Sequence, residues 1–130
     1  MELKKIKPVF KDDRGNIIDI LVNVPTEHVS IISSKKGAIR GNHFHKETIQ
    51  WVYLHSGKLK SLTQNTGEEI ISKIMIAGDL IRTEKLEKHS LTALEDSEFI
   101  VLTKGPRGGK NYENDTFRLK IPLNDPDENE

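Results

Sequence analysis

The chain has 130 residues, 35% of them hydrophobic and 31% charged, which fits one soluble globular domain and disfavours a two-domain protein. Lys and Arg number 20 and so do Asp and Glu, and this zero net charge argues against binding to nucleic acid or to an anionic membrane surface. The absence of cysteine excludes disulfides, a thiolate nucleophile and cysteine-ligated metal centres. No apolar run approaches the ~20 residues that span a bilayer, and the amino-terminal segment lacks an apolar export signal, so we expect a cytoplasmic protein.

The apolar residues come in short runs rich in Ile, Val and Leu, separated by Gly, Asn, Asp, Lys and Ser. This rhythm predicts β-strands. In chain order, the predicted strands cover residues 17–22, 29–33, 49–55, 58–63, 69–76, 89–94 and 98–103. Many short strands with little room for crossover helices favour an antiparallel sandwich or barrel.

Two segments depart from this rhythm. In residues 80–89, Glu84 and Lys88 have the spacing of a helical ion pair, so local propensity favours a helix there. Residues 122–130 are acidic and almost without apolar side chains, which predicts a solvated tail. The simplest organisation is one barrel domain over residues 1–121, followed by this tail.

The candidate functional residues are most concentrated around two histidines. On an extended chain His43 and His45 project to the same face, so their imidazoles can grip one ion or one substrate. Gln50 falls on the same inward stripe as Val52 and Leu54, and burying its amide without a partner would cost about 1–3 kcal/mol. For an isolated pair of this kind, the alternative is one surface histidine and one core histidine.

Residues 41–57 read G-N-H-F-H-K-E-T-I-Q-W-V-Y-L-H-S-G, which resembles the first motif of the cupin superfamily. Gly78, Asp79 and His89 resemble the start and end of the second cupin motif. The resemblance implies an all-β, single-domain cupin: a double-stranded β-helix, or jelly-roll barrel. It also implies that residues 80–89 form a strand and turn that deliver His89 to the barrel interior, although Glu84 and Leu86 replace the usual Pro and Gly.

A narrower resemblance uses the same residues. The pattern Arg40-Gly41-x-His43-x-His45-Lys46-x-x-x-Gln50 is similar to the signature of the sugar-nucleotide 3,4-ketoisomerases. Residues 12–17 (D-D-R-G-N-I) are similar to an opening shared by these isomerases and the dTDP-sugar 3,5-epimerases, and residues 112–118 (Y-E-N-D-T-F-R) to the isomerase carboxyl terminus. The resemblance implies a metal-free isomerase or epimerase of a nucleotide-linked 4-keto-6-deoxy sugar, acting in polysaccharide biosynthesis.

The residue types suit that chemistry. Moving a carbonyl from C4 to C3 of a sugar through an enediol needs an acid and a base of near-neutral pKa, as histidine provides. By resemblance, His43 and His45 are the proton-transfer pair. Gln50 or His89 would hydrogen-bond the developing enediolate. Arg40 is a candidate for binding the diphosphate, its alternative being a surface salt bridge.

Two other functions stay open at this point. In a metal-binding cupin, His43, His45, Gln50 and His89 would ligate Fe, Mn, Ni or Zn, with Gln50 a poorer ligand than the usual Glu. A non-catalytic sugar-binding or regulatory cupin would keep the pocket without the acid and base.

The expected ligand is a nucleotide sugar or another small anion, and the expected partner is a second copy of the chain. Cupins of this type usually pair through sheet edges, and an outward face with Trp51 and Tyr53 would suit a homodimer. His28 and His55 belong to neither motif and are predicted to be structural or surface residues. Residues 105–110 (G-P-R-G-G-K) predict a flexible loop over the barrel mouth.

Overall fold

The computed structural model describes residues 1–106 and 113–128, and these form strands and no helix. The strands are β1 (Glu2–Lys5), β2 (Phe10–Asp12), β3 (Gly15–Ile17), β4 (His28–Ser34), β5 (Ile39–Phe44), β6 (Ile49–Ser56), β7 (Lys58–Gln64), β8 (Ile71–Ile76), β9 (Asp79–Thr83), β10 (Lys88–Ala93), β11 (Ser97–Lys104) and β12 (Phe117–Arg118). The described residues thus include no helix that is long and apolar enough to cross a membrane.

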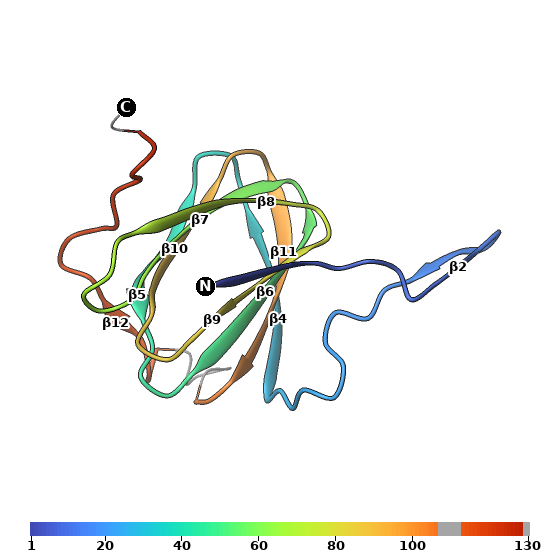
Figure 1. The fold of residues 1–130 in the computed structure, drawn as a ribbon, viewed down its shortest axis with the longest axis horizontal. Helices are drawn as coiled ribbons and strands as arrows, with labels where there is room; N and C mark the ends of the chain where they lie inside the picture. The colour runs from blue at the N-terminus through green and yellow to red at the C-terminus, as the bar shows by residue number, and fades with distance from the viewer. Residues whose placement is uncertain (107–112, 129–130) are drawn as a thin grey trace.

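The strands form two five-stranded antiparallel sheets that face each other, in the orders β1-β9-β6-β11-β4 and β12-β5-β10-β7-β8 (Figure 1). Strands β4 to β11 pair in a nested way: β4 with β11, β5 with β10, β6 with β9, and β7 with β8. This pairing is that of a jelly roll. The all-β fold prediction is confirmed, and β2 and β3 form a separate hairpin that projects from the barrel (Figure 1).

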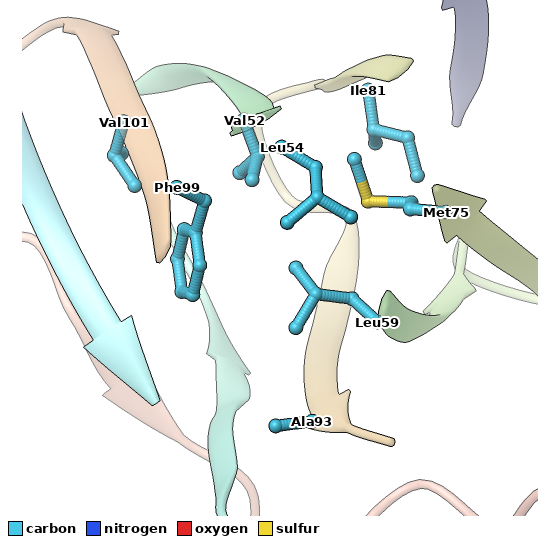
Figure 2. Packing of buried hydrophobic residues seen from close by; sticks show 8 residues of the cluster. All are labelled: Val52, Leu54, Leu59, Met75, Ile81, Ala93, Phe99 and Val101. Atoms are coloured by element: carbon cyan, nitrogen blue, oxygen red, sulfur yellow. The ribbon is translucent and has the colours of Figure 1, made fainter. Parts of the chain in front are cut away.

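Apolar side chains from both sheets fill one part of the barrel interior, as Figure 2 shows. One sheet contributes Val52, Leu54, Ile81, Phe99 and Val101, and the other Leu59, Met75 and Ala93. Val52 and Leu54 thus take the inward positions that strand alternation predicts. Gln50 shares this inward stripe nearer the start of β6, where the interior becomes polar.

The outer face of β6 differs from its prediction. Trp51 and Tyr53 are only 6% and 5% exposed, because the amino-terminal part of the chain covers them with Ile6, Ile20 and Leu21. Their side chains are therefore not available to a second copy, and that reason for expecting a homodimer was wrong. The predicted strand over residues 17–22 is also wrong beyond Ile17, where β3 ends.

The helix that propensity favours over residues 80–89 does not form. This segment consists of β9, a turn and the start of β10, as the cupin resemblance implies. Leu86, in the position where cupins usually have Gly, has a φ of +68°, so the left-handed turn is kept without the glycine. Tertiary pairing of β9 with β6 and of β10 with β5 outweighs the local helical preference.

Part of the carboxyl-terminal tail contacts the barrel. The Leu123 N–H donates to Asn42 Oδ1 at 3.0 Å, and Lys60 forms an ion pair with Asp125. Asp125 is only 8% exposed, so this part of residues 122–130 is not surrounded by solvent. Most of the predicted loop at residues 105–110, from Arg107 onward, lies outside the described residues.

Candidate active site

Two of the histidines lie opposite each other on paired strands. His43 on β5 and His89 on β10 are register partners, and the register shifts between His89 and Ser90. Gly41 makes this irregular pairing possible: its φ is +93°, and a Cβ there would lie 2.8 Å from the His89 carbonyl oxygen. Asn42 follows with a φ of +56°. The Gly in the first motif therefore permits the close approach of the two histidine strands.

The third histidine completes a cluster. His45 follows β5, and its ring centroid lies 4.9 Å from that of His43 and 5.1 Å from that of His89. The His43 and His89 centroids are 4.7 Å apart. His45 and His89 are buried and His43 is half-buried. The three side chains that sequence reasoning selected therefore converge, whereas His28 and His55 do not join them.

Backbone carbonyls fix the orientation of two of the rings. His45 Nδ1 lies 2.8 Å from the Asp115 carbonyl oxygen, and His89 Nδ1 lies 3.1 Å from that of Glu87. Because a carbonyl oxygen can only accept a hydrogen bond, we assign the proton of each neutral ring to Nδ1. In both rings Nε2 then has the lone pair that can accept a proton or bind a metal.

Two of the three histidines, His43 and His89, border a pocket of about 310 Å³, whereas His45 does not line it. Four predicted site residues line it, namely Arg40, His43, Gln50 and His89. Apolar side chains of the opposite sheet, including Phe99 and Val101, line another part of the pocket. This combination of an apolar wall with a few converging polar groups is typical of a small-molecule site.

Charged residues at the pocket include two arginines. Arg40 donates from Nε to the Ser34 hydroxyl at 2.7 Å and from Nη2 to the Ser33 carbonyl at 2.8 Å. It makes no ion pair within the described residues. Arg118 pairs with Glu113 at 2.7 Å, and both line the pocket.

Asp115 ties the carboxyl-terminal segment to His45. Its carboxylate accepts hydrogen bonds from the N–H groups of Lys46 and Glu47 and from the Thr48 hydroxyl, at 2.8 to 3.0 Å. Burial alone raises the pKa of Asp115, but these hydrogen bonds and the adjacent His45 outweigh it and hold the pKa below its usual value. The Asp115 carboxylate thus holds the turn after His45, and the Asp115 backbone carbonyl holds the His45 ring.

Sequence reasoning did not assign roles to Glu113, Asp115 or Arg118 individually. The only signal was the resemblance of residues 112–118 to the isomerase carboxyl terminus, and Tyr112 of that segment lies outside the described residues. β12 brings this segment to the site, because Arg118 is the register partner of His43. A two-residue strand is too short to be recognised from its own sequence.

The donor set also fits a transition metal. The three histidines each offer one ligand nitrogen, and these atoms lie within 4.8 Å of one another. In a tetrahedral zinc site the ligand nitrogens are about 3.4 Å apart, so modest side-chain movement would bring them around one ion. A histidine that ligates a metal through Nε2 usually donates its Nδ1–H to a carbonyl or carboxylate oxygen, as His45 and His89 do here.

Comparison with known proteins supports the fold. A 3,4-ketoisomerase from Helicobacter canadensis is 18% identical, with a TM-score of 0.75 over 91% of this chain and 90% of that chain. QdtA, a sugar 3,4-ketoisomerase from Thermoanaerobacterium thermosaccharolyticum in complex with TDP, is 20% identical, with a TM-score of 0.71 over 92% and 88%. The Mycobacterium tuberculosis rmlC epimerase is 16% identical, with a TM-score of 0.75 over 90% and 67%.

No curated protein sequence matches the chain. Residues 10–117 match the family described as the polysaccharide biosynthesis C-terminal domain. The structural neighbours establish the RmlC-like cupin fold, and the family match covers most of the sequence. The chain is thus a member of the polysaccharide biosynthesis C-terminal domain family with a cupin jelly-roll fold.

Proposed function

We propose that this protein is an isomerase or epimerase that moves a proton on a nucleotide-linked 4-keto-6-deoxy sugar. The main support is the cluster of three histidines beside a pocket that also contains two arginines. The structural neighbours include sugar 3,4-ketoisomerases and a sugar epimerase, and one of them was determined with TDP. The family description agrees with a role in making polysaccharides.

In the proposed reaction, a histidine removes the acidic proton from the carbon next to the sugar carbonyl and an enediolate forms. Return of a proton to the neighbouring carbon gives the 3-keto isomer, and return to the opposite face of the same carbon gives the epimer. His43 borders the pocket and would contact the sugar, with His45 as the second member of the pair. Histidine is suited to both transfers, as a base when neutral and as an acid when protonated, because its unperturbed pKa is about 6.5.

Two further groups would stabilise the charge that develops. The Gln50 amide lines the pocket and has N–H donors for the enediolate oxygen. In its assigned tautomer His89 has a lone pair on Nε2, so this nitrogen would donate only when protonated. Arg40 and Arg118 line the same pocket and suit a diphosphate, whose oxygens accept paired hydrogen bonds from guanidinium.

The test is proton exchange with solvent. The purified protein is incubated with dTDP-4-keto-6-deoxyglucose in D2O, and the C3 position is followed by proton NMR. We expect deuterium at C3, and loss of its incorporation in His43→Asn but not in His55→Asn, a histidine outside the cluster. Absence of exchange with a panel of keto-sugars, together with binding of TDP, would contradict catalysis and favour the sugar-binding or regulatory alternative.

The metal-binding alternative is favoured by one observation, the proximity of the three histidine nitrogens. His43, His45 and His89 would hold the ion, with Gln50 as a fourth ligand from the pocket wall, and the ion would supply Lewis-acid or redox chemistry. Elemental analysis of the purified protein separates the two functions. A stoichiometric transition metal that His89→Ala loses would contradict the metal-free isomerase.

We also propose that the protein forms a homodimer, supported by surface groups other than Trp51 and Tyr53. The projecting β2–β3 hairpin exposes Phe10 and Ile17, each at least half exposed, and an isolated two-stranded hairpin is only marginally stable. β4 forms an open edge of its sheet, with Val29 and Ile31 exposed. Light scattering should give twice the 14.8 kDa chain mass, and the mass of one chain would contradict the dimer.

A further inference from the structure

Glu87 is a buried carboxylate that the proposed reaction does not use. It lies in the turn between β9 and β10, is 1% exposed and does not line the pocket. Its Oε2 lies 2.5 Å from the Met1 ammonium group, and its Oε1 accepts the Glu84 N–H at 3.1 Å. Burying a charged carboxylate is unfavourable unless it is paired and hydrogen-bonded, and Glu87 meets both conditions through these two contacts.

The carboxylate closes the turn in which it lies. The Glu87 N–H donates to the Glu84 carbonyl at 3.2 Å, while the Glu84 N–H donates to the Glu87 side chain. Between them, Leu86 adopts a left-handed φ of +68°, which side chains other than glycine rarely adopt. The surrounding contacts must therefore hold this turn against the preference of its own backbone.

The same turn contacts two of the three clustered histidines. The Leu86 N–H donates to the His45 carbonyl at 2.6 Å, and the Glu87 carbonyl accepts the His89 Nδ1–H at 3.1 Å. One bond fixes the backbone of His45 and the other fixes the ring of His89. A shift of the turn would therefore alter both histidines.

We propose that Glu87 is a positioning residue of the histidine cluster. Its carboxylate holds the β9–β10 turn so that the Glu87 carbonyl keeps the His89 proton on Nδ1 and leaves the lone pair on Nε2. Glu87 acts through His89 and does not touch the substrate. The effect on catalysis rests on the proposed function, but the effect on the His89 ring does not.

The test compares Glu87→Gln with a matched control at the opposite end of β9. Asp79 is also fully buried, pairs with Lys5 at 2.8 Å and accepts the Ile76 N–H at 2.9 Å, but has no contact with the cluster in any of these bonds. Asp79→Asn therefore removes an equivalent buried charge. The tautomer of His89 is read from long-range ¹H–¹⁵N correlations of the imidazole rings, recorded with and without chelator, in the wild type and both variants.

We expect the Nδ1–H tautomer of His89 in the wild type and in Asp79→Asn, and a clear population of the Nε2–H tautomer in Glu87→Gln. Deuterium exchange should show kcat lowered by about 10- to 100-fold in Glu87→Gln, as for other residues that orient a functional histidine. KM should stay within about twofold, because the substrate contacts remain. An unchanged tautomer in Glu87→Gln, or an equal change in Asp79→Asn, would overturn the positioning role.

A second variant covers the case in which Glu87→Gln fails to fold. Glu87→Asp keeps the charge but shortens the side chain by one methylene group, so it should weaken the hydrogen bond from the Glu84 N–H and produce a smaller change of His89 tautomer in the same direction. No change in Glu87→Asp would then overturn the proposal. A tautomer change in Glu87→Gln with no exchange by the wild type would support the positioning role and contradict the proposed reaction.

Discussion

On both β6 and β10, the side chains that point into the barrel are polar near the start of the strand and apolar farther along. The inward side chains of β6 run from Gln50 to Leu54, and those of β10 run from His89 to Ala93. At the apolar end, side chains from both sheets pack together and need only fill the space between the sheets. At the polar end, hydrogen bonds from the β9–β10 turn and the carboxyl-terminal segment hold His45 and His89. In this barrel, therefore, the apolar end holds the sheets together, while the polar end depends on segments outside the sheet interior.

The largest expected effect concerns activity at the polar end. His43→Asn should lower kcat for deuterium exchange by about 10²–10⁴-fold, the usual contribution of a general acid or base. Its free energy of unfolding should change little, because His43 is only half-buried. Urea unfolding of the same sample provides the control. Deuterium exchange by His43→Asn at the wild-type rate would show that His43 takes no part in the reaction.

At the apolar end the expectation is reversed. Leu54 is fully buried, so Leu54→Ala should lower the free energy of unfolding by about 2–5 kcal/mol, measured by urea unfolding. The folded fraction should exchange deuterium at the wild-type rate. Val22→Ala is the matched control, since Val22 is 60% exposed and its loss should have little effect. Equal destabilisation by the two variants would contradict the assigned core.

Asp115→Asn tests the contact between the carboxyl-terminal segment and the polar end. An asparagine cannot accept all three hydrogen bonds of the carboxylate, so unfolding free energy should fall by about 1–3 kcal/mol. Deuterium exchange should also slow, because the turn after His45 would loosen. Asp13→Asn, at an exposed position, is the control. Loss of stability without slower exchange would show that the clamp is structural only.

The smallest effect is expected where the tail meets the barrel. The Lys60 ammonium group lowers the pKa of Asp125, and Asp125 raises the pKa of Lys60. A lowered carboxyl pKa adds stability above the unfolded-state value of about 3.9, and this is lost as pH falls through the folded-state pKa. Lys60 adds stability below about pH 10.4, which is lost as pH rises through its own raised pKa.

Asp125→Asn should therefore lower the urea midpoint slightly at pH 7 and leave it unchanged near pH 2. The comparison of the two midpoints is the measurement. An equal decrease at both pH values would mean that the loss comes from packing of the segment and not from the ion pair.

Sequence reasoning recovered the strands whose apolar runs are local and strong. Predicted residues 49–55, 58–63 and 98–103 correspond closely to β6, β7 and β11. β1 and β12 were not predicted, because each is short and forms by adding to the edge of a sheet that other residues build. Burial of Trp51 was missed for a similar reason, since distant residues such as Ile20 cover it.

The clustered histidines of the candidate site could be predicted from the sequence, but the orientations of their side chains could not. The histidine pair and His89 could be identified because motif spacing and strand alternation determine which residues share a face. Their ring orientations could not, because they depend on the carbonyls of Asp115 and Glu87 in segments with no recognisable local pattern. The left-handed Leu86 is a further example, since its residue type gave no indication of its backbone conformation.

The nested strand pairing has a consequence for how the protein acquires its site. β4 pairs with β11 and β5 with β10, so long stretches of chain must close into loops before these ladders can form. Chains dominated by such distant pairings fold slowly, in milliseconds to seconds. His43 and His89 are register partners within one of those ladders, so a chain released before β10 is made has no site. The appearance of the proposed proton exchange during refolding would therefore report the pairing of β5 with β10.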